Sequence, residues 1–408
     1  MLVLMTAVLF GFMGFAVDLG RLYMIRAELK SGANAMALAA AAQLNGTSAA
    51  EGAASTAAQT ARASSGGFQL RWDFGGIPVG GSAGNTGSVV EEPEFFETAE
   101  GAIGGDTGGG STATGTAPMR HVRLSVTAEA PLVFWRFLAQ GQQGTTPIRV
   151  QAAAGVSAPL CTACGIESIA IAAPDASDTE NFGLVPGTRY TLGQQCTGVP
   201  NPQPLAPATQ RLPYLLINRV NDQATTFADE STQALRIGAG GLPGTTIEAL
   251  SCVSVNAVEA VWTAATPVQC NPARVAAQVT AFLCGLASRF ETGTFSGCES
   301  VPEIDAAITG YPIDTDVADV EDYAAYTGNG RRVLTIVVVE AITDPAALVV
   351  LGFRQFLLEP GANQTNIAPL DTNGRFNALY IGSVSPVKQG RFSGCSLAAG
   401  PGKVVLHQ

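Results

Sequence analysis

The segment PDASDT follows an apolar run and places Asp175, Ser177 and Thr179 at alternate positions. Carboxylate and hydroxyl oxygens are the kinds of ligand that Mg²⁺ binds in proteins. Pro174, which precedes the first aspartate, and a second acid, Asp178, within the segment are typical of a polar turn. We therefore expect a turn here, and Asp175, Ser177 and Thr179 remain weak candidates for a metal site.

A second acidic segment, DTDVADVED, covers residues 314–322. Its carboxylates have the chemistry of calcium ligands, but the segment lacks the central glycine and the distal glutamate of an EF-hand loop. We expect a solvated acidic loop rather than a calcium site.

The eight cysteines all lie beyond residue 160, and their spacing is irregular. An even number of cysteines without a second C-x-x-C pair favours disulfides formed in an oxidising compartment over a zinc site. Eight cysteines allow roughly a hundred pairings, so the connectivity stays open. The disulfide candidates are Cys161, Cys164, Cys196, Cys252, Cys270, Cys284, Cys298 and Cys395.

The chain is poor in groups for catalysis. It has two histidines, His121 in an alternating segment and His407 near the end. Nucleophilic triads need a positioned imidazole, and we find neither a G-x-S-x-G elbow nor a phosphate-binding loop. We expect no enzymatic activity, no cofactor and no small-molecule substrate.

Composition excludes some partners and favours a location. Asp and Glu number 33 against 22 Lys and Arg, for a net charge of −11. Without a basic run to neutralise phosphates, a nucleic-acid partner is not expected. Charged residues make up 13% of the chain, about half the globular norm of roughly 25%, which suits the cell envelope better than the cytosol.

The N-terminal run MLVLMTAVLFGFMGFAV is apolar apart from Thr6. Seventeen or so apolar residues are about the lower limit for a helix that spans a bilayer. A cleaved secretion signal has a basic stretch before the apolar run and a small-residue site soon after it. Neither is found, so we expect residues 1–20 to be retained as a transmembrane anchor.

The helical pattern continues past Asp18. Apolar residues recur at spacings of three and four as far as Leu44, and Asn45-Gly46 gives a stop signal. Ser48 and Glu51 resemble a capping box for a second helix that ends before Ser64. The residues of the apolar stripe are Leu22, Ile25, Leu29, Ala33, Met36, Ala40 and Leu44.

The remaining elements predict an α+β fold with small antiparallel sheets and a disulfide-stabilised C-terminal half. Its segments are a transmembrane anchor (1–20), a helix plus antiparallel sheet (21–157) and a cysteine-containing extracytoplasmic α+β domain (158–408). Helices are expected at 131–138, 214–220 and 271–290, and a glycine-rich loop at 75–117. Strands are expected at 68–74, 121–128, 148–156, 168–173, 331–342, 347–360 and 376–386, with 333–339 central because it is apolar on both faces.

The segment GFAVDLGRLYMIRAELKSGANAMALAAAAQLNG resembles the N-terminal signature of the TadE/TadG-like proteins of tight-adherence (Flp) pilus assembly. That signature is an apolar span, then V-D-x-G-R-x-Y-x-x-R-x-x-L-Q, then an alanine-rich helix. Val17 to Arg21, Tyr23, Arg26 and Leu29 match it, whereas Lys30 stands in place of the glutamine. The resemblance covers residues 1 to about 170 and is looser beyond.

The resemblance implies a non-enzymatic, membrane-anchored component of pilus assembly or surface adhesion. Its partners would be the membrane and other pilus-assembly or envelope proteins, contacted by a helix surface that includes Asp18, Arg21, Tyr23 and Arg26. The protein would be a single-pass protein of the bacterial inner membrane with most of the chain periplasmic. Arg21, Arg26 and Lys30 favour the opposite orientation by charge, but the cysteines outweigh them.

The alternative is a metal-dependent adhesion module or a secreted binding protein. Asp175-x-Ser177-x-Thr179 is similar to the metal-ion adhesion motif of von Willebrand A domains, a fold that some TadG-like chains carry. The parallel βαβ alternation of that fold is not evident after the motif.

Overall fold

The computed structural model describes residues 2–64, 88–104, 118–132, 134, 145–195, 203–217, 252–259, 272–290, 298, 313–342, 348–360, 367, 371 and 373–407. The chain divides into two compact units. Unit 1 comprises residues 1–46, 50–156 and 404–408, and unit 2 comprises residues 47–49 and 157–403. Each unit has its own hydrophobic core.

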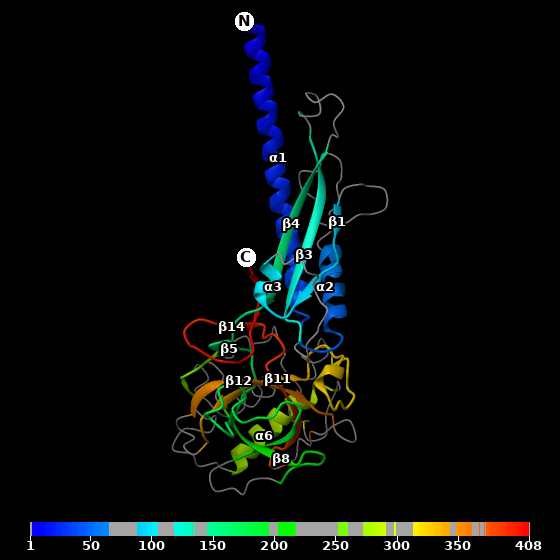
Figure 1. Cartoon of the computed structure of the whole chain (residues 1–408). Helices are drawn as coiled ribbons and strands as arrows, with labels where there is room; N and C mark the ends of the chain where they lie inside the picture. Colours follow the sequence, from blue (N-terminus) through cyan, green and yellow to red (C-terminus); the bar gives the residue numbers. More distant parts are fainter. Residues whose placement is uncertain are drawn as a thin grey trace. The chain divides into compact units, whose positions relative to one another are not determined.

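Unit 1 begins with two helices (Figure 1). The helix α1 covers Leu2–Ala41 in 40 residues, and α2 covers Ala50–Ser64. The predicted stripe of α1 is confirmed: Ile25, Leu29 and Ala33 are buried, as are the later members. The second helix begins at Ala50, one residue later than a cap at Ser48 predicts, and the hydroxyl of Ser48 donates to the carbonyl of Ala324.

The sheet of unit 1 has the strand order β1-β3-β4-β15, and β2 also pairs with β3. Strands β3 and β4 form a long antiparallel hairpin. Their pairing extends from His121 opposite Gly155 to Pro131 opposite Thr145. The C-terminal strand β15 adds to the other edge of β4, where His407 lies opposite Ala153. The strands are β1 (Ser88–Val90), β2 (Glu94–Phe96), β3 (His121–Pro131), β4 (Thr145–Val156) and β15 (Val404–His407).

Helix α1 packs on one face of this sheet. Val122, Leu124 and Val126 of β3 lie in one buried cluster with Ile25 and Leu29 of α1, as the predicted alternation requires. The prediction of a glycine-rich loop at 75–117 is wrong for the middle of that segment, which forms β1, β2 and the short helix α3 (Ala99–Ile103). Pairing with β3 orders these residues, a long-range contact that local composition does not reveal.

Within the residues that the structure describes, no helix is both long enough and apolar enough to cross a membrane. The N-terminal helix is present as expected, but the structure does not bear out its expected span of the bilayer.

Unit 2 is built on a seven-stranded sheet with the order β10-β12-β11-β6-β8-β7-β13, in which β12 also pairs with β13. A three-stranded sheet, β14-β5-β9, lies in the same unit. The strands are β5 (Thr162–Cys164), β6 (Ile169–Ala172), β7 (Arg189–Gln194), β8 (Gln210–Leu216), β9 (Val253–Ser254), β10 (Val258–Glu259), β11 (Val333–Val339), β12 (Leu348–Leu358), β13 (Phe376–Gly382) and β14 (Gln389–Arg391).

The α+β class and the small antiparallel sheets are confirmed, but the larger sheet is mixed. Strand β11 is parallel to β6, and β7 is parallel to β8. Strand β11 lies between β6 and β12, so its central position is confirmed. A run that is apolar on both faces must be covered on both faces, and the residues of β11 accordingly belong to two buried clusters.

One helix expected in unit 2 is wrong and another is confirmed. The described part of 214–220 continues β8, which pairs with β6 and β7, because apolar residues without a clear period do not separate a buried strand from a helix. Helix α6 (Pro272–Ala287) forms as expected, and it buries Val279, Phe282 and Leu286 in the main core. The strand expected at 68–74 and most of the helix expected at 131–138 lie outside the described residues.

Candidate functional site on the N-terminal helix

The first half of α1 carries large apolar side chains that the described residues leave exposed. Phe10 and Phe12 are 73% and 70% exposed, although a side chain of this kind is usually placed in a core. The second half of the same helix packs on β3 and β4 (Figure 1). The exposed apolar residues of α1 are Met5, Leu9, Phe10, Phe12, Met13, Phe15, Val17, Leu19, Tyr23 and Met24.

Asp18 lies within the exposed apolar run of α1 but is itself buried. It is only 4% exposed, and its Oδ2 accepts a hydrogen bond from the backbone N–H of Phe134 at 3.0 Å. Phe134 also covers Gly14, one turn earlier on α1, where a Cβ would lie 2.8 Å from the Phe134 side chain. A bonded acceptor is the arrangement expected for a buried carboxylate.

The other residues of the predicted helix surface do not share one environment. Tyr23 is 65% exposed and Arg26 is exposed, whereas Arg21 is half-buried. Tyr23 and Arg26 are three residues apart, so they lie on the same side of the helix. The structure thus places Asp18 inside the fold and Tyr23 and Arg26 at its surface.

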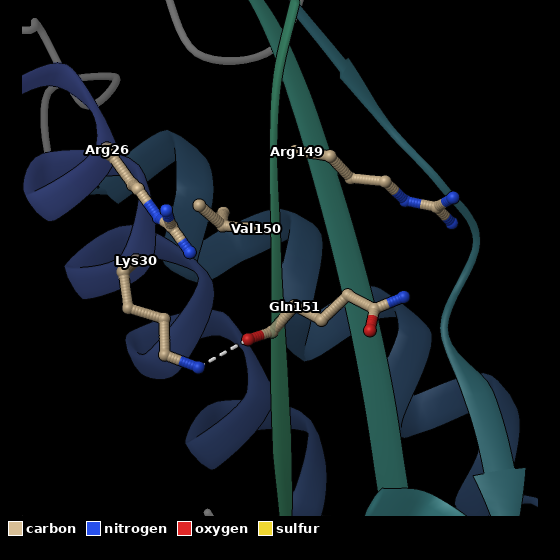
Figure 2. A pocket seen from close by; sticks show the side chains of 5 residues that line it. All are labelled: Arg26, Lys30, Arg149, Val150 and Gln151. Atoms are coloured by element: carbon tan, nitrogen blue, oxygen red, sulfur yellow. Dashed lines mark hydrogen bonds between the residues drawn. The ribbon is translucent and has the colours of Figure 1, made fainter. Parts of the chain in front are cut away.

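An open groove of about 460 Å³ lies between α1 and β4, next to this surface (Figure 2). Arg26 and Lys30 line it from the helix, and Val150 and its neighbours Arg149 and Gln151 line it from the strand. The Lys30 ammonium donates to the backbone carbonyl of Gln151. Arg149 instead directs its guanidinium away from Arg26 and Lys30, and it pairs with Glu91 at 2.9 Å.

Arg26 has no hydrogen bond or ion pair with any residue that the structure describes, and Lys30 bonds only to the Gln151 carbonyl. The sequence pattern marks Arg26 as part of the helix surface but gives no sign of the groove. Local sequence patterns cannot reveal this groove, because its second wall is β4, which is distant from α1 in the sequence.

The segment with the candidate metal ligands forms a tight turn. The Oδ1 of Asp175 accepts the backbone N–H and the hydroxyl of Ser177, at 2.9 and 2.6 Å. These bonds lower the pKa of Asp175. The carboxylate of Asp178 accepts three backbone N–H groups, from Glu180, Asn181 and Gly183. The predicted turn is present, and Thr179 contributes its carbonyl to the guanidinium of Arg354.

The acidic segment 314–322 is in part buried, contrary to the expected solvated loop. Asp314 is 1% exposed and accepts the Tyr326 hydroxyl and the Arg332 backbone N–H. The buried Arg332 side chain donates to the carbonyls of Leu358, Asp316 and Ala318. This segment is therefore fixed to β12 by an arginine that sequence patterns do not mark.

Arg189 joins the same segment to the sheet. Its guanidinium contacts the carboxylate of Glu359 at 2.6 Å and that of Asp319 at 3.0 Å. Glu359 is 2% exposed, and its burial raises its pKa to about 7 despite the nearby Arg189. One cation thus lies between two carboxylates in unit 2, of which one is buried and the other is exposed.

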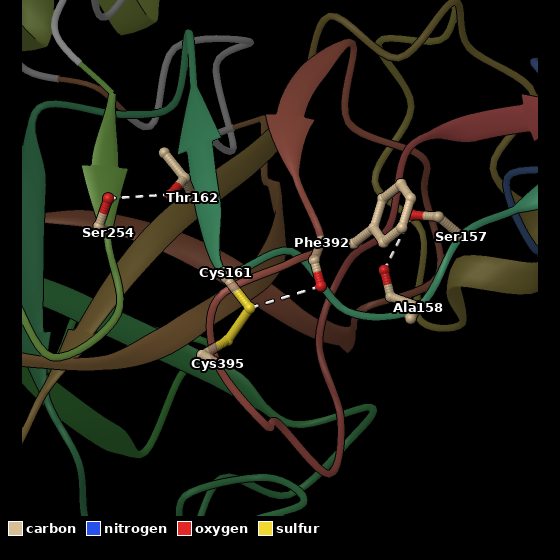
Figure 3. Close-up of a disulfide and its surroundings, with 7 residues drawn as sticks. All are labelled: Ser157, Ala158, Cys161, Thr162, Ser254, Phe392 and Cys395. Atoms are coloured by element: carbon tan, nitrogen blue, oxygen red, sulfur yellow. Dashed lines mark hydrogen bonds between the residues drawn. A yellow bond between two sulfur atoms is a disulfide. The ribbon is translucent and has the colours of Figure 1, made fainter.

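The sulfur atoms of three cysteine pairs lie at disulfide distance: Cys161–Cys395, Cys164–Cys252 and Cys284–Cys298. Figure 3 shows the first of these beside Phe392, with the side chains of Thr162 and Ser254 bonded across β5 and β9. The expected disulfides are confirmed for these six cysteines. Cys196 and Cys270 lie outside the described residues.

The two histidines of the chain meet in unit 1. The rings of His121 on β3 and His407 on β15 are 5.1 Å apart, in an edge-on arrangement. Burial, and next the charge of His407, lower the pKa of His121. No local pattern predicts this pair, because the strands that carry the two histidines are both neighbours of β4 but are far apart in the chain.

Among the residues with described positions, no group of three or more His, Cys, Asp or Glu side chains is arranged to hold a metal ion. Comparison of the chain with known protein families, with curated proteins and with solved structures found no match.

Proposed function

We propose that this protein is a non-enzymatic component of the bacterial cell envelope, held at a membrane by the N-terminal half of α1. The observation that carries the proposal is the set of ten large apolar residues of α1 between Met5 and Met24 that are exposed. An apolar surface of this kind marks a site of contact with lipid or with another protein.

The charge pattern of α1 supports the same role. The exposed apolar residues end at Met24, and Arg26, Glu28 and Lys30 follow within two turns. An apolar segment followed by cations and an aromatic residue such as Tyr23 is typical of helices at a membrane boundary. The carboxylate of Asp18, which lies within this segment, is buried and accepts a hydrogen bond from the backbone N–H of Phe134.

The disulfide-distance cysteines favour an extracytoplasmic location for unit 2. Disulfides persist in oxidising compartments and are rare where thiols are kept reduced. We therefore propose that unit 2 is periplasmic or faces the exterior. The resemblance of residues 14–46 to the TadE/TadG-like signature leads us to propose a role in tight-adherence pilus assembly, with other envelope proteins as partners.

The proposal is tested by fractionating cells that express the full chain. We expect the protein in the membrane fraction, resistant to alkaline extraction, with unit 2 accessible to protease from the periplasmic side. Replacement of Phe10, Phe12 and Met13 by serine should release the protein into the soluble fraction. Recovery of the unaltered protein in the soluble fraction would refute the proposal.

A matched control separates a local effect from a general loss of surface hydrophobicity. Ile103, Val185 and Phe392 are also exposed apolar residues, but they lie outside α1. Their replacement by serine should leave the protein in the membrane fraction.

A further inference from the structure

We propose that the groove formed by Arg26 and Lys30 with β4 binds the phosphate group of an anionic phospholipid, whose acyl chains lie along the exposed apolar face of α1. The inference rests on the proposed membrane association and adds a lipid class and a binding site to it. Four observations carry it: an arginine without a partner among the described residues, a second cation beside it, an open groove and a continuous apolar stripe.

The charges of Arg26 and Lys30 favour an anion in the groove. Arg26 and Lys30 are four residues apart on α1, so their side chains are neighbours on the same side of the helix. Like charges at this spacing are unfavourable unless an anion lies between them. No carboxylate of the described residues pairs with either one, whereas Arg149 on the strand is neutralised by Glu91. The groove therefore has two cations available for one anion.

The hydrogen-bond donors of Arg26 and Lys30 match the oxygens of a phosphate group. A guanidinium presents two parallel N–H groups, which match two oxygens of a phosphate. The ammonium of Lys30 uses one of its three N–H groups on the Gln151 carbonyl, which leaves two donors and holds the side chain at the groove. Figure 2 shows both side chains on the helix side of the groove, to the left of Val150 and Gln151 on the strand.

The two cations of the groove are continuous with the exposed apolar surface of α1. Phe12, Phe15, Leu19 and Tyr23 precede Arg26 at spacings of three and four, so these exposed residues form one stripe with the two cations. From Phe12 to Tyr23 the helix rises about 16 Å, which is close to the ~15 Å hydrocarbon depth of one leaflet. An anionic phospholipid is charged at one end and apolar over this length, and its phosphate suits the two donors of a guanidinium.

The test is lipid retention by the detergent-solubilised full chain, followed by native mass spectrometry. The protein is incubated with equal amounts of phosphatidylglycerol and phosphatidylcholine that have the same acyl chains. The unaltered protein should retain phosphatidylglycerol over phosphatidylcholine by roughly tenfold or more, since each nearby cation contributes severalfold. The variant Arg26→Gln/Lys30→Gln should retain the two lipids nearly equally.

The matched control is Lys388→Gln/Arg391→Gln, which removes one lysine and one arginine from exposed positions in unit 2. It should keep the preference of the unaltered protein. The single variant Arg26→Gln, which removes no hydrogen bond or ion pair with a described residue, should lose part of the preference without any change in thermal unfolding.

Three results would overturn the inference. Equal retention of both lipids by the unaltered protein would exclude a site that selects a lipid of net negative charge, even where fractionation still shows membrane association. Unchanged preference in the Arg26→Gln/Lys30→Gln variant would place the anion elsewhere. Abolition of the preference by inorganic phosphate at millimolar concentration would indicate a phosphate site without a contribution from the acyl chains. Failure of the proposed function is distinct, because it is read from the cell fractions.

Discussion

Asp18 of α1 accepts a hydrogen bond from the backbone N–H of Phe134, 116 residues away in the sequence, with 3.0 Å between the nitrogen and Oδ2. The same phenylalanine lies over Gly14, so one residue both satisfies the buried acid and covers the helix one turn away. The conspicuous acid of the N-terminal segment therefore has a structural role within unit 1, and Tyr23 and Arg26 are left as the surface residues.

Asp18→Ala should destabilise unit 1. The change leaves the Phe134 N–H without its acceptor and removes a bonded group from a site that is 4% exposed. We expect the free energy of unfolding to fall by about 1–2 kcal/mol. Asp18→Asn keeps an acceptor oxygen and should cost less. Chemical denaturation of the detergent-solubilised protein measures both, and equal losses for the two variants would argue against the hydrogen bond.

Two glycines of α1 should respond oppositely to alanine. A Cβ at Gly20 meets nothing within 4 Å, whereas a Cβ at Gly14 lies 2.8 Å from Phe134. Alanine favours a helix interior by up to about 1 kcal/mol over glycine, so Gly20→Ala should raise the melting temperature. Gly14→Ala should lower it, because Phe134 must move. A similar gain in both variants would show that Phe134 does not pack on α1.

The periodic parts of the chain were predictable because their signal is local. The stripe from Leu22 to Leu44 and the alternation of 121–128 each repeat within a few residues, and each defines a buried face in the structure. The helix α6 was predictable for the same reason.

The parts that failed depend on residues distant in the sequence. The run at 214–216 is a strand because β6 and β7 lie on either side of it, and its own residues have no period that excludes a helix. The groove beside Arg26 needs β4 as its second wall, and the Asp314 network needs Arg332 and Tyr326. Composition predicted the disulfides but not their pairing, since pairing is set by the sheets that carry the cysteines.

Removal of the Cys164–Cys252 disulfide should strongly destabilise unit 2. The bond closes a segment of 88 residues and joins the region of β5 to that of β9. Loss of a crosslink of this size increases the conformational entropy of the unfolded chain, at a cost of roughly 4–5 kcal/mol. The variant Cys164→Ala/Cys252→Ala should therefore unfold at lower denaturant concentration.

As a control, the variant and the unaltered protein are both unfolded in the presence of a reductant, which removes the disulfides of both, and their two unfolding curves should then converge. Intact-mass analysis without reductant should also show the loss of two hydrogen atoms for each disulfide formed. If the variant were as stable as the unaltered protein under oxidising conditions, the disulfide would be absent, or it would constrain the unfolded chain very little.

Glu359 should make unit 2 less stable as the pH rises from about 4.5 to about 7. Its pKa in the folded protein is raised to about 7, chiefly by burial, so the folded state binds more protons than the unfolded state in this interval. The stabilisation that comes from the neutral carboxyl is complete below the pKa of the unfolded state and is lost as the pH rises through the pKa of the folded state.

The variant Glu359→Gln keeps a neutral side chain at every pH and should flatten this part of the stability curve. Asp319, the other carboxylate on Arg189, is 53% exposed, and Asp319→Asn should leave the slope in place. Melting temperatures measured between pH 4.5 and 8 decide the matter, because a slope that persists in Glu359→Gln would assign the titration to another group.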